Sequence, residues 1–271
     1  MSFPTPHTHS PRNTHTHTAI LLHGRGSDGP EFADEFLSCK TSQGKTLPES
    51  LPHWRWVLPT SRLRWSAIFE EEICTWFDAA SLDDIQKRQD LQVEGLRESV
   101  SHILNILEEE IKLLDERSER VYLGGISQGM ATSLWTLLSA PDRINGRIGG
   151  FVGFCGWLPF AHQAEQMIQQ NTGLDRKIIV SDMCRRIIAD PKNPTQRGTN
   201  DVSVFETPVF LSHGVDDPWV SVSLGRQAAR VLQAMGIQTE WKEFAGAESE
   251  GHWVKEPEGF DQILRFFQNE V

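Results

Sequence analysis

A single serine separates a strand-like run from a helix-like run in the middle of the chain. Residues 121–123 are apolar, residues 131–138 read ATSLWTLL, and the residues between them, 124–130, read GGISQGM. Gly-x-Ser-x-Gly between a strand and a helix is typical of a sharp, strained turn that lifts the serine hydroxyl clear of a sheet edge. Glycines two positions either side suit such a turn, because a Cβ there would collide with the neighbouring strand and helix. The same pattern also arises where glycines serve only packing, so a reactive Ser127 requires a base and an oxyanion site elsewhere in the chain.

Short apolar runs alternate with longer periodic runs from residue 18 onward. Between 91 and 114, apolar residues recur at three- and four-residue steps with charged residues between them, which predicts a long amphipathic helix. Strands alternating with helices indicate βαβ units and a mainly parallel sheet covered on both faces. We therefore predict one α/β domain over residues 18–271. Its strands are expected at 18–24, 54–59, 121–126, 147–156, 207–214 and 237–244, and its helices at 91–114, directly after Ser127, and at 161–170, 221–235 and 257–269.

Two segments depart from this alternation. Residues 1–17 consist largely of Pro, Thr and His and cannot offset their ordering entropy by burial, so we expect a flexible arm there. Its histidine pairs lack preorganised geometry, and no metal site is predicted. Residues 171–206 are too long for an ordinary connection and carry basic residues in an acidic protein. We interpret them as short helical pieces around 176–189 that form a lid, or alternatively as a solvated surface excursion.

The composition argues against several kinds of function. The 26 basic and 37 acidic residues give a net charge of −11, which disfavours nucleic acid or an anionic membrane as the main partner. Four widely spaced cysteines indicate neither a metal knuckle nor a disulfide framework and fit a reducing compartment. No apolar run is long enough to span a membrane, and the N-terminal region has no signal-peptide core. We expect a cytoplasmic protein without cofactor or metal; the sequence makes no prediction of its oligomeric state.

A nucleophilic serine needs a base that takes its proton and a carboxylate that holds the base in one tautomer. In sheet-based hydrolases the order along the chain is Ser, then Asp or Glu, then His. The histidines after Ser127 are His162, His213 and His252. His162 comes too early in this order, and His213 precedes the pair of aspartates. His252 follows a predicted strand and opens into the last helix, so it is the predicted general base.

The carboxylate is expected one strand earlier, in the loop that follows the strand predicted at 207–214. Residues 212–220 read SHGVDDPWV and offer Asp216 and Asp217. Pro218 restricts its predecessor to an extended conformation and so aims the Asp217 side chain. We interpret Asp216 as a residue that shapes the turn, and Asp217 completes the predicted triad.

Two backbone amides are expected to stabilise the oxyanion of an acyl-transfer reaction. One is the amide of the residue after the nucleophile, Gln128, and the other comes from the loop after an early strand. Residues 21–29, LLHGRGSDG, fit that loop because Gly24 and Gly26 let the backbone approach closely, and the Arg25 amide is the predicted second donor. The loop lacks the Walker lysine and the G-x-G-x-x-G spacing, which argues against phosphate binding.

Taken together, these segments resemble the acyl-protein thioesterase, carboxylesterase and phospholipase family of α/β hydrolases. The matching pieces follow the family's order over residues 18–260: LLHGRGSDG, LPTSR, WFD, GGISQGM, GFCGWLP, SHGVDDPWV and the GHW histidine. The resemblance implies an α/β-hydrolase fold that cleaves carboxylic esters or thioesters with a Ser-His-Asp triad, and the family's aspartate matches Asp217. Met130 and Arg25 depart from the family pattern, which usually has a glycine and a small or apolar residue at these two positions.

Large apolar residues beside the motif loops are interpreted as walls of an acyl pocket. Each tryptophan taken singly is more often a packing residue. The set comprises Trp65, Trp76, Met130, Trp157, Trp219 and Trp253.

The sequence therefore predicts a serine esterase or thioesterase whose partner is its ester or thioester substrate. An acylated protein and a small-molecule ester are alternative substrates. A non-catalytic binding protein on the same scaffold is the alternative from another class, because fold does not dictate activity.

Overall fold

The computed structural model describes residues 2–66, 68–81, 84–171, 173, 175–189 and 202–269. Within them, the centre is a seven-stranded sheet in the order β1-β3-β2-β6-β7-β8-β9, in which β1 runs antiparallel to β3 and all other neighbours are parallel. This confirms the predicted mainly parallel α/β sheet. The strands are β1 (His7–His9), β2 (His17–Leu22), β3 (Trp54–Leu58), β6 (Val121–Ile126), β7 (Gly150–Phe154), β8 (Val209–Gly214) and β9 (Thr239–Phe244).

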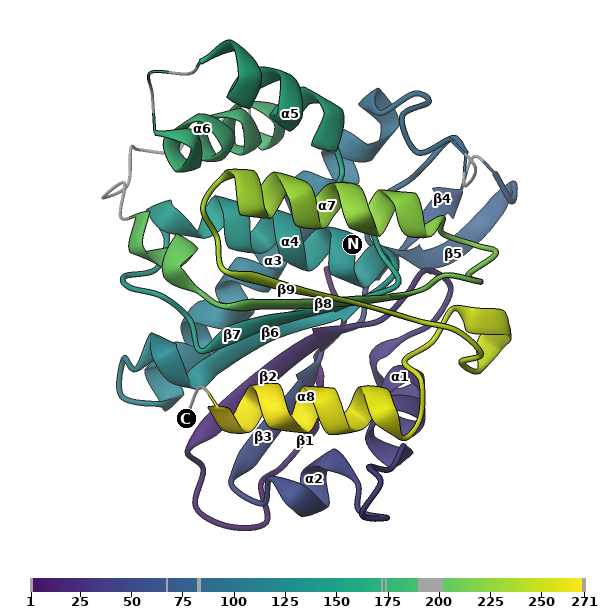
Figure 1. The fold of residues 1–271 in the computed structure, drawn as a ribbon, viewed down its shortest axis with the longest axis vertical. Helices are drawn as coiled ribbons and strands as arrows, with labels where there is room; N and C mark the ends of the chain where they lie inside the picture. The colour runs from purple at the N-terminus through teal and green to yellow at the C-terminus, as the bar shows by residue number, and fades with distance from the viewer. Residues whose placement is uncertain are drawn as a thin grey trace.

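Helices cover both faces of the sheet (Figure 1). Along β2, Ala19 and Leu21 join the apolar cluster on one face, and Ile20 and Leu22 join the cluster on the other. This alternation follows from the two-residue period of a strand. One face carries α1 (Gly29–Ser38), α2 (Leu47–Ser50) and α8 (Glu258–Asn269), and the other carries α3 (Asp90–Leu113), α4 (Gln128–Ser139) and α7 (Val222–Ala234), with α5 (Ala161–Gln170) and α6 (Arg176–Ile188) outside them. Short 3-10 helices lie at Ser118–Arg120, Ala140–Asp142, Val202–Glu206 and Ser249–Gly251.

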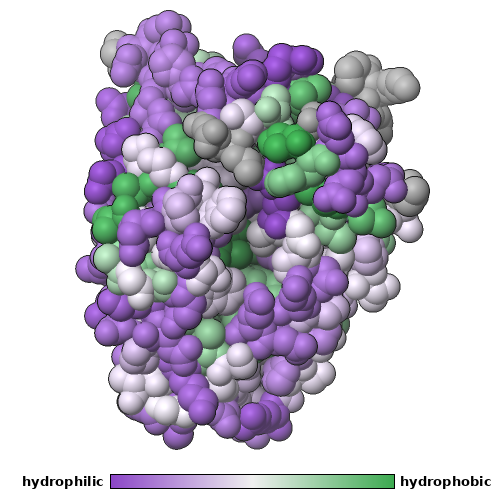
Figure 2. Space-filling model, turned by 90° about the vertical axis from the view of Figure 1, so that its right-hand side faces the viewer, coloured by the Kyte–Doolittle hydropathy of each residue, from purple (hydrophilic) through white to green (hydrophobic). Residues whose placement is uncertain are grey.

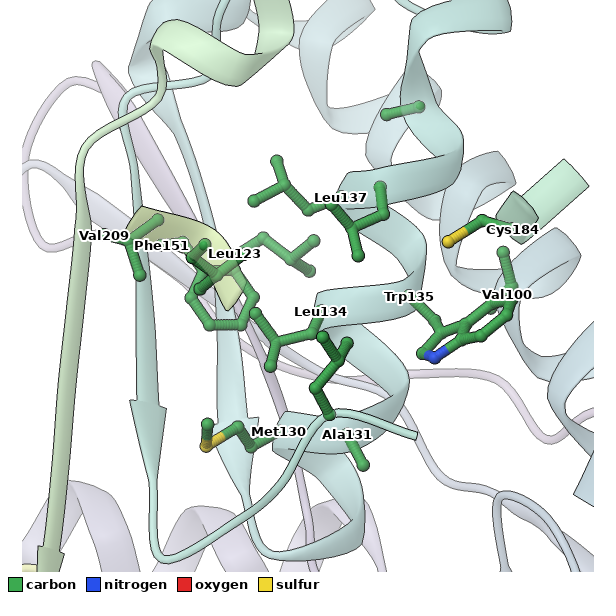
Figure 3. Packing of buried hydrophobic residues seen from close by; sticks show 14 of the residues in the cluster. Val100, Leu123, Met130, Ala131, Leu134, Trp135, Leu137, Phe151, Cys184 and Val209 are labelled. Carbon is green, nitrogen blue, oxygen red and sulfur yellow. The ribbon is translucent and has the colours of Figure 1, made fainter. Parts of the chain in front are cut away.

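Helix α4, which follows the serine turn, is buried along its whole length. Figure 3 shows Leu134 and Leu137 pointing from α4 towards Phe151 of the sheet, while Trp135 points the other way, towards Cys184 of α6. The hydroxyls of Thr132 and Thr136 donate to carbonyls of the helix itself, so α4 can be covered on all sides. The packing of α4 between the sheet and α6 therefore fixes the position of the residue at its start.

The first residues of the chain join the sheet, contrary to the expected flexible arm. Strand β1 pairs with β3, and His7 lies opposite Leu58. Strand pairing uses backbone groups, so a segment with few apolar side chains can still complete an open sheet edge. Phe3 adds a side-chain contact, because its ring stacks on that of His102 with centroids 4.0 Å apart.

The described part of segment 171–206 packs as a layer and does not form the expected lid. Helix α6 agrees with the helical pieces predicted around 176–189 and packs against α3, α4 and α5. Its buried side chains include Val180 and Cys184. None of the described residues in this segment lines the cavity found at the sheet edge. Residues 190–201 lie outside the described residues.

A separate antiparallel hairpin stands between β3 and α3. It consists of β4 (Arg62–Ser66) and β5 (Glu71–Thr75). The hairpin, α1 and α2 were not among the predicted elements. In the described part of the chain, no helix combines the length and the apolar character that crossing a bilayer requires.

Candidate active site

A cavity of about 580 Å³ opens at the carboxyl ends of the parallel strands. The loops after β2, β6, β7, β8 and β9 all contribute to its wall, and the β4–β5 hairpin closes another side. Figure 2 looks onto this side of the molecule and shows a hollow with apolar side chains at its floor and along part of its rim. In open parallel sheets, ligands bind at this edge.

Ser127 stands on a strained turn between β6 and α4. Its φ of 56° and ψ of −123° are uncommon for a residue with a side chain, and its amide donates to the Phe154 carbonyl at 2.9 Å. The flanking glycines are required for the reason predicted. A Cβ on Gly125 would lie 2.6 Å from the Leu22 carbonyl oxygen, and a Cβ on Gly129 would overlap the same atom. The turn presents Ser127 to the cavity.

Asp217 and His252 form a hydrogen-bonded pair at this cavity. The Asp217 Oδ2 atom lies 2.7 Å from His252 Nδ1, and both His252 and Ser127 line the cavity. Because the carboxylate engages Nδ1, the other ring nitrogen, Nε2, is left to accept a proton. Two of the three residues predicted as a triad thus line one cavity, and the third, Asp217, is hydrogen-bonded to one of them.

The Asp217 carboxylate is surrounded by donors. Its Oδ1 accepts the backbone amides of Trp219 and Val220, both at 2.9 Å, and His213 Nε2 lies 3.2 Å from Oδ2. Burial by itself raises the pKa of the Asp217 carboxyl, but hydrogen bonds from His213, His252 and the Val220 amide outweigh it and hold the pKa below its usual range. The group therefore stays ionised and can stabilise an imidazolium at His252.

The other histidines and the other aspartate have different positions. His213 is fully buried, and its Nε2 carries the ring proton because both neighbours of this atom, the Asp217 carboxylate and the Val220 carbonyl, are acceptors. His162 lies exposed on α5 and does not line the cavity. Asp216 Oδ2 accepts the Gly246 amide at 2.7 Å, so this residue shapes the loop before His252.

The two predicted oxyanion donors flank the serine turn. Gln128 begins α4, and the loop that carries Arg25 follows β2. A Cβ on Gly24 would lie 3.6 Å from Ser127 Cβ, so this loop lies directly against the turn. Among the described residues, neither amide donates to a backbone carbonyl. The Gln128 amide also lies at a helix N-terminus, where negative charge is favoured.

His23, which the sequence analysis did not single out, holds the Gly24–Arg25 peptide. Its buried ring accepts the Ser61 amide at Nε2 with a distance of 3.0 Å, so the proton is on Nδ1, which donates to the Gly24 carbonyl at 2.5 Å. Burial lowers the pKa of His23 to about 4 and keeps the ring neutral. The carbonyl and amide of one trans peptide point in opposite directions. Anchoring the Gly24 oxygen therefore sets the direction of the Arg25 amide.

The Gln128 side chain ties the other predicted donor, the Gln128 amide, to the same network. Its Oε1 accepts the Thr75 hydroxyl at 2.8 Å and the Trp76 amide at 2.9 Å, and its Nε2 donates to the Phe77 carbonyl at 2.7 Å. The indole nitrogen of Trp76 in turn donates to the His23 carbonyl at 2.9 Å. The segment after β5 thus connects the two predicted oxyanion donors.

Three of the five predicted pocket tryptophans line the cavity, namely Trp157, Trp219 and Trp253. Trp65 lies on β4 with 60% of its surface exposed, and Trp76 is fully buried. Neither of these two lines the cavity. Trp65 faces away because alternate strand residues point to opposite sides. The Trp76 side chain instead donates to the carbonyl of His23, next to the loop that carries Arg25.

Met130 also lies outside the cavity wall. It packs where a Cβ on Gly153 or Gly156 would come within 2.9 Å of its side chain. The two glycines leave the room that this larger residue needs. Phe69 and Ile73 of the hairpin line the cavity and were not predicted. Residues 66–75 read SAIFEEEICT, and no apolar alternation in this stretch marks either residue.

One group of possible metal donors overlaps the triad. The donor atoms of Cys155, Asp217 and His252 lie within 4.8 Å of one another. Burial raises the pKa of the Cys155 thiol to about 12, so it remains neutral, and thiols bind metals as thiolates. The carboxylate and the imidazole are already paired with each other at 2.7 Å. We assign the group to the triad and its packing.

Related sequences are named either as acyl-protein thioesterases or as carboxylesterases. Acyl-protein thioesterase 1 of Gibberella zeae is 26% identical over 262 residues, which are 95% of this chain and 92% of that protein. An Arabidopsis thaliana protein described as "Probable carboxylesterase SOBER1-like" is 28% identical over 91% of this chain and 77% of its own length.

Solved structures have the same fold. Acyl-protein thioesterase 2 of Zea mays superimposes with a TM-score of 0.70 at 24% identity and covers 99% of both chains. A carboxylesterase of Bacillus cereus gives a TM-score of 0.59 at 12% identity over 98% of this chain and 94% of its own. These similarities confirm the α/β-hydrolase fold. The family model described as Phospholipase/Carboxylesterase matches residues 4–183. Because this match spans well over half of the sequence, the chain belongs to the phospholipase/carboxylesterase family of α/β hydrolases.

Proposed function

We propose that the protein is a serine hydrolase that cleaves carboxylic esters or thioesters through an acyl-enzyme. The observation that carries the proposal is the hydrogen bond between Asp217 and His252 at the wall of a cavity that Ser127 also lines. The names of its relatives, acyl-protein thioesterase and carboxylesterase, belong to the same class of reaction.

The reaction proceeds in two halves. His252 Nε2 takes the proton of Ser127 as the serine oxygen attacks the acyl carbonyl, and the same proton then passes to the departing alcohol or thiol. Water attacks the acyl-enzyme with His252 again as base, and the free acid leaves. Asp217 keeps Nδ1 protonated and stabilises the imidazolium. The amides of Gln128 and Arg25 stabilise the oxyanion, each contributing about 3 kcal/mol.

Two substrate classes fit this chemistry. A thioester on an acylated protein is favoured by the relatives named acyl-protein thioesterase. A small-molecule oxygen ester is favoured by the charged side chains of Arg25, Glu35 and Glu71 in the cavity wall, because a long lipid chain has no use for them. A series of acyl esters and thioesters of increasing chain length separates the two, since a rate maximum at short acyl groups for both series argues against a lipid substrate. All four cysteines are free thiols, and we expect a cytoplasmic location.

The test of the proposal is Ser127→Ala, compared with Ser101→Ala on the exposed side of α3. We expect kcat for p-nitrophenyl butyrate to fall by about 10⁶-fold in the first variant and to stay at the wild-type value in the second. A fluorophosphonate probe should label the wild type and Ser101→Ala but not Ser127→Ala. Wild-type turnover that survives Ser127→Ala would exclude this site, and a wild type that neither hydrolyses nor labels would favour the non-catalytic binding protein.

A further inference from the structure

The side chain of Arg25 stands in the cavity, although the proposed reaction uses only its amide. Its guanidinium carbon lies 5.6 Å from the centre of the Phe69 ring, which lines the same cavity from the turn between β4 and β5. Among the described residues, this guanidinium has no hydrogen bond or ion pair. A charged group with five donors is thus held against a ring inside a substrate-sized cavity.

The physical state of this group favours an anionic ligand. Burial lowers the pKa of Arg25, and the negative charge of Asp78 acts in the opposite sense; a guanidinium remains charged under both influences. The Phe69 ring can cover only the flat face of the guanidinium. The N–H donors of the guanidinium lie in its plane, at the edge, and stay accessible. A carboxylate accepts two of these donors side by side, which is the strongest hydrogen-bonding arrangement open to them.

Acidic side chains in the same wall limit what can bind. Glu35 and Glu71 both line the cavity. Burial raises the pKa of Glu35, and the neighbouring Glu31 adds a smaller contribution in the same sense. A second negative charge on a ligand would be repelled by these groups. The wall therefore suits one carboxylate at Arg25 and disfavours a dianion.

We propose that the Arg25 side chain binds a carboxylate of the substrate, so that the enzyme prefers monoanionic esters or thioesters to neutral ones. The inference rests on the proposed function, because it concerns the substrate of the same reaction. The carboxylate belongs either to the far end of the acyl chain or to the leaving group, and both present the same chemistry to the guanidinium.

Two matched substrate pairs distinguish these sources. The acyl pair is the p-nitrophenyl ester of adipic acid with a free distal carboxylate and its methyl-capped neutral counterpart. The leaving-group pair is the butyryl thioester of mercaptoacetate and that of mercaptoethanol. For each pair, the ratio of kcat/KM for the anionic to the neutral substrate is measured in the wild type and in three variants, Arg25→Met, Arg25→Lys and Glu71→Gln.

We expect the ratio for one of the pairs to fall about tenfold or more in Arg25→Met, to fall less in Arg25→Lys, and to rise in Glu71→Gln. A ratio on one preparation does not depend on how much of it is folded. Equal ratios in the wild type and Arg25→Met for both pairs would overturn the inference, even if Arg25→Met accepts longer acyl chains. If the ratios are equal but the neutral substrates are still hydrolysed, the proposed function stands and only the carboxylate inference falls. If the wild-type protein is inactive on all four substrates, the proposed function and the carboxylate inference both fall.

Discussion

The ring of His23 is expected to control the Arg25 amide, and two substitutions separate its two hydrogen bonds. In His23→Asn, the side-chain amide nitrogen takes approximately the place of Nδ1 and keeps a donor for the Gly24 carbonyl. In His23→Gln, the side-chain oxygen takes approximately the place of Nε2 and keeps an acceptor for the Ser61 amide. Each variant loses one buried hydrogen bond, so the free energy of unfolding should fall by a similar amount in both, about 1 kcal/mol apart from the change in packing.

The effects on turnover should differ. Removing one oxyanion donor lowers kcat by about 10²- to 10³-fold in serine hydrolases. In His23→Gln, the amide of Arg25 is still present, but its peptide loses the hydrogen bond that holds the Gly24 oxygen at 2.5 Å from the ring. We therefore expect kcat to fall about 10- to 100-fold, with KM little changed because the oxyanion exists only in the transition state. His23→Asn keeps that hydrogen bond, and its kcat should fall less than about threefold.

The measurement combines steady-state hydrolysis of p-nitrophenyl butyrate with the rate of fluorophosphonate labelling. Both report stabilisation of a tetrahedral oxyanion at Ser127. Thermal unfolding of the two variants provides the control, since equal losses of stability with unequal kcat assign the difference to the Gly24 contact. Equal kcat in His23→Asn and His23→Gln, or wild-type kcat in His23→Gln, would refute the reasoning.

Two further predictions concern charge. Asp217→Asn presents a donor to His252 and favours the wrong tautomer, so kcat should fall about 10⁴-fold with a small change in KM; a fall below tenfold, measured with the same ester, would remove Asp217 from the triad. The pKa of His102 is lowered to about 4 by burial. The unfolded chain takes up this proton below about pH 6.5 and the folded chain takes it up only near pH 4, so the free energy of unfolding should fall as the pH drops through this window. Urea unfolding at several pH values should show a shallower fall in His102→Gln, and an unchanged slope would contradict the assignment.

The catalytic loops were predictable because each contains a residue whose backbone constraint can be read directly. Gly125 and Gly129 are required where the chain passes within contact of the Leu22 carbonyl. Pro218 narrows the choice between two adjacent aspartates, and the structure places the second of them, Asp217, at 2.7 Å from His252. At these glycines and this proline, the residue type itself restricts the local backbone, so the local geometry could be predicted from the sequence.

Elements held by other forces were harder to predict. Strand β1 pairs through its backbone and leaves no apolar pattern. On β4, Leu63 and Trp65 are 53% and 60% exposed, so these apolar side chains do not face the core. The hairpin therefore departs from the rule that apolar strand residues point inward, on which a strand prediction depends. Helix α1, by contrast, carries readable start signals, since Asp28 caps it by accepting the Glu31 amide at 2.8 Å and a proline follows in the first turn.

The segment between β3 and α3 has two roles that are physically linked. Its hairpin supplies cavity residues such as Phe69, while Ser61 before the hairpin and Trp76 after it bind His23. The Gln128 side chain binds the same stretch after β5. A shift of this segment would therefore move the cavity wall together with both amides that we propose as oxyanion donors. Substrate range and transition-state stabilisation are for this reason not independent here, and a substitution that tilts the hairpin to admit a larger acyl group should lower kcat even for substrates that the wild type already accepts.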